Sequence, residues 1–253
     1  FITKGESVVV DLSADFRMRN PDIYENYYCQ HPKPDLCNTA VYGLSEQYKT
    51  EIKNSKLIGN PGCYPTSILL PLIPLIKNDL IELTGIISDS KSGVSGAGKT
   101  PTPTTHFVET NESFAAYAVG DEHRHLSEIN EQLSLFAKQD VNILFTPHLV
   151  PMTRGILSTI YVTPKSGVTK ANISQVLSSA YEKESMVAFL GESLPKTSYV
   201  SGTNRCMFGM KWANNGKNLI LVSVIDNLIK GASGQALQNM NVALGLPGNT
   251  GLI

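Results

Sequence analysis

The sequence predicts an α/β protein in which short strands alternate with helices. Runs rich in Val, Ile and Leu, from 8–12 near the start to 218–225 near the end, alternate with segments of helical periodicity. A length of 253 residues suffices for one large domain or two modest ones. The apolar fraction of 42% and the charged fraction of 17% are those of an ordinary globular protein.

The first half of the chain carries helix and strand signals that are separated by turn residues. Apolar runs of three to five residues indicate strands, and longer apolar or amphipathic runs indicate helices. The expected elements are strands over 8–12, 57–59 and 85–89 and helices over 45–53 and 67–77, followed by a loop rich in Gly, Ser, Thr and Pro over 90–105.

The second half adds capping and hairpin signals. Ser127 and Thr169 are good N-caps, so each is expected to start a helix, the second of which ends near Glu184. Asn214-Asn215-Gly216 is a hairpin turn between two strand-like runs. The remaining expected elements are strands over 142–146, 156–163, 205–213 and 218–225 and a last helix over 228–244, rich in small residues.

Composition and cysteine spacing restrict the possible partners. The net charge is −1 and no basic run occurs, so nucleic acid is not an expected partner. No apolar run approaches the roughly 18 residues of a membrane span, so no membrane partner is expected either. The four cysteines form no CxxC pair and no metal-like spacing with His, which predicts no metal and a reducing, cytoplasmic location.

The turn around Cys63 is the strongest chemical signal. Pro61-Gly62 forces a turn after a short strand, and Pro65 suits the first turn of the apolar helix that follows. Cys63 is therefore expected at a helix N-terminus, where free N–H groups and the helix dipole lower a thiol pKa and stabilise an oxyanion. The alternative is a buried cysteine that acts only as a small apolar side chain.

The run 93–100 matches the phosphate-loop pattern GxxxxGK[ST]. That pattern requires a helix directly after its Lys-Thr pair, but Pro101 and Pro103 follow here and disfavour one. A nucleotide triphosphatase is therefore disfavoured. A Gly-rich loop after a strand can still let the backbone approach a cofactor.

Histidines and arginines supply the remaining candidate chemistry. His125, and less favourably His123, could provide an imidazole for proton transfer beside a thiolate, although a surface histidine is the common alternative. Arg17 follows a strand end and Arg154 precedes a strand, so either could clamp a phosphate or carboxylate. Solvation at the surface is the default interpretation for both arginines.

Seven segments together resemble the N-acetyl-γ-glutamyl-phosphate reductase family, within the aspartate-semialdehyde dehydrogenase-like group. The resemblance covers nearly the whole chain. It implies NADPH-dependent reduction of N-acetylglutamyl phosphate to the semialdehyde and phosphate in arginine biosynthesis, and a homodimer or homotetramer. The segments are VVVDLSADFR, AVYGLSE, NPGCYPTS, SKSGVSGAGKT, AYAVGDEHRHLSEI, FTPHLVPMTRGILSTI and DNLIKGASGQALQ.

The resemblance also implies roles for single residues. Cys63 resembles the nucleophile that forms a thioester, and His125 resembles the acid/base, with His123 as the less favoured alternative. The substrate-binding positions are Arg17, Tyr117 and Arg154, and the NADP-binding positions are Ser92, Gly93 and Asn227.

The same resemblance implies a domain plan. It predicts a Rossmann-type dinucleotide-binding domain, here incomplete because the family's opening strand and Gly-rich loop are not found, and an α+β catalytic domain with a mixed sheet. The expected parts are 1–62, 63–226 and a C-terminal helix, 227–253, that returns to the first domain. The alternatives are an aspartyl or aminoadipyl phosphate reductase, or a truncated, non-catalytic relic kept for oligomer contacts.

Overall fold

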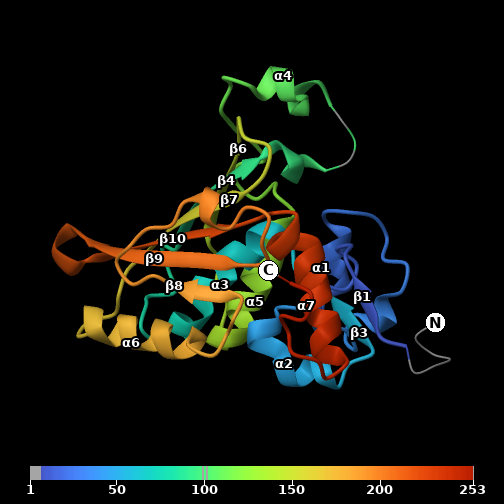
Figure 1. Cartoon of the computed structure of the whole chain (residues 1–253), viewed down its shortest axis with the longest axis horizontal. Coiled ribbons are helices and arrows are strands. Elements are labelled where there is room, and N and C mark those ends of the chain that lie inside the picture. Colours follow the sequence, from blue (N-terminus) through green and yellow to red (C-terminus); the bar gives the residue numbers. More distant parts are fainter. Residues whose placement is uncertain (1–6, 99, 101, 253) are drawn as a thin grey trace.

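The computed structural model describes residues 7–98, 100 and 102–252, which form two sheets with helices around them (Figure 1). The small sheet is parallel, in the order β1-β3-β2, and the large sheet is mixed, in the order β5-β6-β4-β7-β10-β9-β8. The α/β class with a mixed second sheet is thus confirmed. The strands are β1 Val9–Asp11, β2 Val41–Tyr42, β3 Leu57–Gly59, β4 Ile87–Gly93, β5 Ala115–Ala116, β6 Leu144–Val150, β7 Ile156–Val162, β8 Val187–Phe189, β9 Cys206–Ala213 and β10 Asn218–Ile225.

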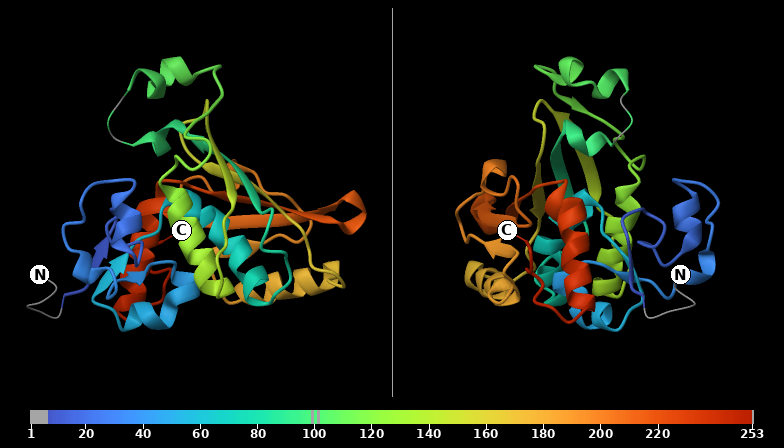
Figure 2. Two further views of the ribbon diagram at one scale, coloured as in Figure 1. Left: turned by 180° about the vertical axis from the view of Figure 1, so that it is seen from behind. Right: turned by 45° about the vertical axis from the view of Figure 1, so that its right-hand side comes forward.

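The helices divide between the two sheets, as the two views of Figure 2 show. The third helix packs against β7 and β10 and is flanked by the fifth and sixth, whereas the second and seventh pack together and the seventh also reaches β1. The helices are α1 Pro21–Glu25, α2 Ser45–Lys53, α3 Cys63–Lys77, α4 Phe107–Thr110, α5 His125–Ala137, α6 Lys170–Tyr181 and α7 Gly234–Ala243, the last preceded by a π-helical turn, Ile229–Ser233.

Helix α3 is the centre of the main core. Every residue from Tyr64 to Ile76 is buried, so the helix is surrounded on all sides. It begins at Cys63 and not at 67 as expected, because Gly62 takes the extended N-cap conformation and Pro65 fits the first turn. The cysteine is therefore the first residue of the helix itself.

Other element boundaries also differ from expectation, among them the end of β6, which runs to Val150 and not to 146, and the start of α7, which follows a π-helical turn. Strand β4 runs on to Gly93, so the expected loop over 90–105 begins later. The apolar pattern missed this because the inward side chains of β4 are buried serines, which hydrogen-bond with one another. Helix α5 begins at His125, so Ser127 is not its N-cap. Ser127 lies in the first turn, where its hydroxyl donates to the carbonyl of Arg124.

Several local predictions are confirmed. Helix α2 and strand β3 have the expected bounds, and β9 and β10 form the expected hairpin. Thr169 caps α6 in a capping box with Asn172, although the helix ends at Tyr181, three residues earlier than expected.

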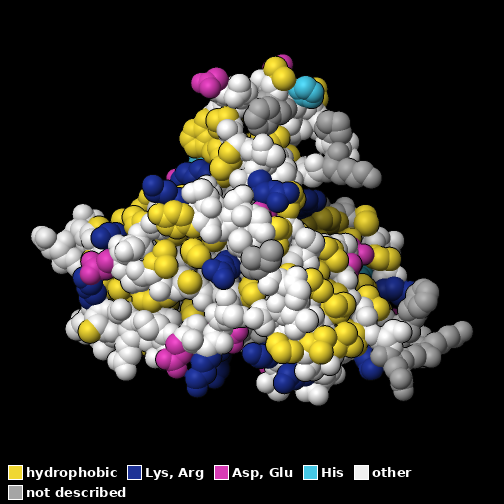
Figure 3. Space-filling model, in the orientation of Figure 1, with side chains coloured by type: hydrophobic (Ala, Val, Ile, Leu, Met, Phe, Trp, Pro, Cys, Tyr) yellow, Lys and Arg dark blue, Asp and Glu magenta, His cyan; other side chains and the backbone are white. Residues whose placement is uncertain are grey.

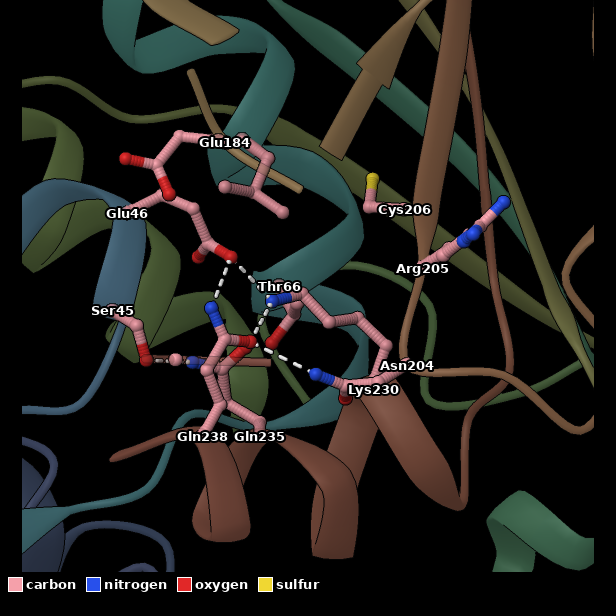
Figure 4. A network of polar contacts seen from close by, with 12 residues as sticks. Ser45, Glu46, Thr66, Glu184, Asn204, Arg205, Cys206, Lys230, Gln235 and Gln238 are labelled. Atoms are coloured by element: carbon pink, nitrogen blue, oxygen red, sulfur yellow. Dashed lines mark hydrogen bonds and ion pairs between the residues drawn. The ribbon is translucent and has the colours of Figure 1, made fainter. Parts of the chain in front are cut away.

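A buried polar network joins α2 to the C-terminal helix (Figure 4). Lys230 Nζ lies 2.6 Å from Glu46 Oε1 and 2.8 Å from Gln238 Oε1, and both side chains of the ion pair are fully buried. Asn204 donates to the same Gln238 oxygen at 2.9 Å. The C-terminal helix is thus fastened to the segment that carries the small sheet. The division of the chain at 62 and 226 itself stays a prediction.

An arm, residues 102–118, projects from one end of the large sheet (Figure 1). It is attached through β5, which pairs with β6. Val108 and Phe114 on this arm are exposed.

Across the described ranges, no helix combines the length and apolar character that a membrane crossing requires.

Candidate active site

Two glycines bracket Cys63 and allow unusually close packing around it. A Cβ atom on Gly231 would lie 2.7 Å from the Cβ atom of Cys63. A Cβ atom on Gly62 would lie 2.7 Å from His125 Nε2 and 3.0 Å from Glu128 Oε2. The imidazole of His125 therefore lies directly against the turn that carries the thiol, as the sequence interpretation required.

Cys63, His123, His125 and Tyr117 line one cavity of about 610 Å³. The structure thus brings together the expected nucleophile, both candidate histidines and one expected substrate ligand. The cavity is also lined by Tyr27, Tyr64, Gly96, Ala97, Thr105, Ala115, Ala116, Ala118, Glu122, Arg124 and Leu149.

The protonation state of the pair differs from expectation. Burial raises the pKa of the Cys63 thiol to about 11, and the N–H of Tyr64 and the positive charge of Arg17 offset this only in part. Burial also holds the pKa of His125 well below its usual value, helped by the neighbouring His123 and by Arg17. The expected lowering of the thiol pKa by the helix N-terminus is wrong for the free site, because desolvation outweighs it. At neutral pH the two groups are a neutral thiol and a neutral imidazole.

The two histidines differ in their contacts. His123 Nδ1 accepts a hydrogen bond from the backbone N–H of His125 at 3.1 Å, so neutral His123 carries its proton on Nε2. Burial lowers the pKa of His123 to about 4. His125 Nδ1 is buried without a hydrogen-bond partner among the described residues, which leaves that nitrogen free.

Glu128 is a site residue to which the sequence analysis gave no role. Its Oε1 accepts from the backbone N–H of Gly62 at 2.8 Å and from the Tyr42 hydroxyl at 2.6 Å. Its Oε2 lies 3.4 Å from Arg17 Nη1. Glu128 follows His125 by three residues in one helix, and this spacing, visible in the sequence, places both on one face.

Arg17 is held by protein groups. Its Nε donates to the Asn60 carbonyl at 2.7 Å and its Nη2 donates to the Leu12 carbonyl at 3.0 Å, in addition to the Glu128 contact. Arg124, in contrast, lines the cavity, and its guanidinium lies 5.6 Å from the centre of the Tyr28 ring. The structure therefore adds Arg124 to the candidate anion-binding residues.

None of the expected cofactor residues, Ser92, Gly93 and Asn227, lines the cavity, but Ser92 and Asn227 lie next to Gly96, which does. Asn227 Oδ1 accepts from the Gly155 N–H at 2.6 Å and its Nδ2 donates to Ser95 Oγ at 3.0 Å. Gly96 lines the cavity, and a Cβ atom on it would lie 2.4 Å from Ser92 Oγ and 3.7 Å from Asn227 Nδ2. The Asn227 amide thus lies next to Gly96, which lines the cavity, and a donor beside a residue without a side chain fits a planar carboxamide.

The loop that matches the phosphate-loop pattern lacks the helix that such a loop requires. Gly93 is the last residue of β4, and a short 3-10 turn, Val94–Ala97, follows. Lys99 and Pro101 lie outside the described residues. In the part of the loop that the structure describes, the next helical turn begins only at Pro103.

Tyr117 and Arg154 are placed differently from one another. The Tyr117 hydroxyl donates to that of Tyr64 at 3.1 Å inside the cavity. Arg154 is not among the cavity-lining residues; its Nη1 lies 3.5 Å from the buried carboxylate of Asp226. Across residues 7–98, 100 and 102–252, no three His, Cys, Asp or Glu side chains are grouped so that they could hold a metal ion.

Comparison with known proteins identifies the family. Residues 63–227 match the family model described as semialdehyde dehydrogenase, dimerisation domain. The chain is 52% identical to the N-acetyl-gamma-glutamyl-phosphate reductase of Desulforapulum autotrophicum, over 96% of this chain and 71% of that protein. It is 49% identical to the protein of the same name from Geobacter sulfurreducens, over 100% of this chain and 73% of that protein.

Solved structures with low sequence identity share the fold. Aspartate semialdehyde dehydrogenase II from Vibrio cholerae, complexed with ASA, superposes with a TM-score of 0.64 at 16% identity, over 82% of this chain and 69% of that one. A probable aspartate-semialdehyde dehydrogenase from Pseudomonas aeruginosa superposes with a TM-score of 0.66 at 16% identity, over 94% of this chain and 72% of that one. The sequence relatives share far more residues over nearly the whole chain, and the chain belongs to the N-acetyl-gamma-glutamyl-phosphate reductase family.

Proposed function

We propose that this chain reduces N-acetyl-L-glutamyl 5-phosphate to N-acetyl-L-glutamate 5-semialdehyde and phosphate, with NADPH, in arginine biosynthesis. One observation carries the proposal: Cys63, the first residue of a helix, shares a cavity with His125, whose ring lies against Gly62. Relatives that carry the reductase name, of which this chain covers 71% and 73%, support it.

The neutral thiol and imidazole define the first step. His125 accepts the proton of Cys63 as sulfur attacks the acyl carbon, so that thiolate forms only when substrate is present. N–H groups of the first turn of α3 stabilise the oxyanion. The new S–C bond remains, the C–O bond to phosphate breaks, and the phosphate leaves. The product of this step is a thioester on Cys63.

The second step requires a nicotinamide dinucleotide. When bound, it supplies the hydride that reduces the thioester. Asn227 and the Gly96 cradle would hold the carboxamide, with Ser92 and Gly93 beside them. His125 returns its proton to sulfur as the S–C bond breaks and the aldehyde leaves. The choice of NADP over NAD rests on the family resemblance.

One arginine, Arg124, lines the cavity and suits an anionic substrate. We propose Tyr117, Arg17 and Arg154 as substrate ligands, and Arg124 as a fourth because it faces the cavity. Arg17 uses three of its five N–H groups in contacts with Asn60, Glu128 and Leu12, so at most two remain for a phosphate.

A homodimer or homotetramer is proposed from the dimerisation-domain match and from the outer face of the large sheet. Leu144, Ile87 and Tyr161 are register partners on adjacent strands and all three are exposed, so they form one apolar row. Figure 3 also shows hydrophobic side chains over β9 and β10. A cytoplasmic location stays a prediction.

The reverse reaction of the full-length enzyme tests the proposal. Phosphate-dependent reduction of NADP should occur with N-acetylglutamate semialdehyde. With aspartate or aminoadipate semialdehyde, kcat/KM should be at least about 100-fold lower, because these substrates lack the acetyl group and site residues that pair with it would stay unpaired. Cys63→Ala should abolish it. NAD in place of NADP tests the cofactor choice. Preference for another semialdehyde would indicate an aspartyl or aminoadipyl phosphate reductase instead. Absence of turnover would indicate the non-catalytic relic.

A further inference from the structure

The buried carboxylate of Asp226 lies at the junction of the loops that surround the site. Its side chain is fully buried. Its Oδ2 accepts from the Gly202 N–H at 2.8 Å and lies 3.5 Å from Arg154 Nη1. Its Oδ1 accepts from the N–H groups of Leu228 at 2.9 Å and Ile229 at 3.2 Å. One carboxylate therefore joins a loop, an arginine and a helix start.

The residues on either side of these contacts belong to the site. The helical turn that Asp226 caps carries Gly231, which packs on Cys63. The next residue, Asn227, holds Gly155, whose carbonyl in turn accepts from the Gly93 N–H at 2.9 Å. A displacement of Asp226 would thus also move Gly231, which packs on the Cys63 thiol, and Asn227, which is proposed to bind the cofactor.

We infer that Asp226 is a positioning residue for the acyl-phosphate reaction, fixing the Arg154 guanidinium for a substrate anion. This inference rests on the proposed function. The Arg154 side chain is 41% exposed, so without Asp226 its charged end would be free to move in solvent. A carboxylate that restrains one guanidinium edge leaves the other N–H groups available to a phosphate or carboxylate.

The charge of Asp226, and not only its shape, is needed for this role. Asn at this position keeps one oxygen but adds an NH₂ group, which cannot accept from Gly202 or attract Arg154. Ser keeps a helix cap but is too short to reach Arg154. The two substitutions therefore separate positioning of the arginine from capping of the helix.

A double-mutant cycle in the full-length enzyme tests the inference. Asp226→Asn should raise KM for the acyl phosphate about tenfold, with a smaller fall in kcat, because Arg154 is no longer oriented. In an Arg154→Ala background the same change should leave KM unaltered. Thr169→Ala, which removes a remote helix cap, is the control and should change thermal stability but neither kinetic parameter.

Two further measurements keep the test decisive. If Asp226→Asn does not fold, Asp226→Ser retains the cap and should raise KM equally. Calorimetric binding of inorganic phosphate needs no turnover, so the cycle can be measured even if the enzyme rejects N-acetylglutamyl phosphate. Loss of phosphate affinity that depends on Arg154 supports the inference. Additive effects of the two substitutions, or a variant with lowered stability but unchanged KM and phosphate affinity, would overturn it.

Discussion

Gly231 lies directly behind Cys63, so close that a methyl group on the glycine would lie 2.7 Å from the cysteine Cβ. Gly231→Ala must therefore displace the π-helical turn or the start of α3. We expect a loss of about 1–3 kcal/mol in unfolding free energy from overpacking, and a kcat lowered about 10–100-fold because the thiol moves. Steady-state kinetics and urea unfolding measure the two effects.

Gly248→Ala is the matched control for this substitution. Its added methyl group would meet Gln238 Cγ only at 3.6 Å, an ordinary contact distance. It should leave kcat unchanged. A Gly231→Ala enzyme with wild-type kcat would show that the close approach is unimportant for the chemistry.

The raised thiol pKa predicts slow alkylation of Cys63 at neutral pH. With a pKa of about 11, the thiolate fraction of Cys63 grows roughly tenfold with each pH unit between 7 and 10. The rate of reaction with iodoacetamide should rise in parallel, without a plateau near the ordinary thiol pKa. Mass spectrometry of the modified peptide gives the rate, and Cys29, which is exposed, serves as the internal reference. A plateau below about pH 8.5 would mean that the helix N-terminus prevails after all.

Buried His123 makes the fold sensitive to acid. Its pKa is about 4 in the folded chain and near 6.5 when unfolded, so above pH 6.5 both states are neutral and stability is complete. As pH falls from 6.5 towards 4, the unfolded chain binds a proton that the folded chain does not, at a cost of about 3 kcal/mol. His123→Gln should reduce the loss of stability between pH 7 and 4.5 in urea titrations. Substitution of exposed His106 by Gln should not.

Local chemistry explains which parts of the fold the sequence could predict. Thr169 and the turn Asn214–Gly216 act through neighbours within a few residues, and both formed as expected. The start of the long helix was placed too late, at 67, although Gly62 is its N-cap and Pro65 lies in its first turn, as the sequence had suggested for Pro65.

Long-range contacts explain what the sequence could not predict. Ser90 and Ser67 both contact Ser158, at 2.8 and 2.7 Å, so polar side chains fill a core position where apolar ones were expected. The engagement of Arg17 by Glu128 joins residues 111 positions apart. The raised thiol pKa depends on burial by the whole fold, which no spacing reveals.

The buried ion pair between Lys230 and Glu46 should be costly to break from one side. Lys230→Met leaves a fully buried carboxylate without its cation and should destabilise the fold by about 3–5 kcal/mol in urea unfolding. A double variant with Glu46→Leu should recover most of this loss, because neither charge then has to be desolvated. Lys170→Ala, in an exposed pair with Glu192, is the control and should have a much smaller effect. Equal losses in the single and double variants would show that packing alone matters.

A proline inside α3 creates the partner for a buried tyrosine hydroxyl. Pro74 has no N–H to donate to the carbonyl of Leu70, and the hydroxyl of buried Tyr181 donates to that carbonyl instead. Tyr181→Phe should therefore cost about 1–3 kcal/mol, because the Leu70 carbonyl is left without a donor.

Pro74→Ala gives the test its control, because it restores the missing amide N–H within the helix. In that background the Leu70 carbonyl keeps a donor, so Tyr181→Phe should cost at least about 1 kcal/mol less than in the wild type. Urea unfolding of the four proteins yields the coupling free energy. If the effects of the two substitutions on unfolding free energy are additive, the hydroxyl is not compensating for the proline. Its hydrogen bond to Leu70 then stabilises the fold independently of the backbone hydrogen bonds of α3.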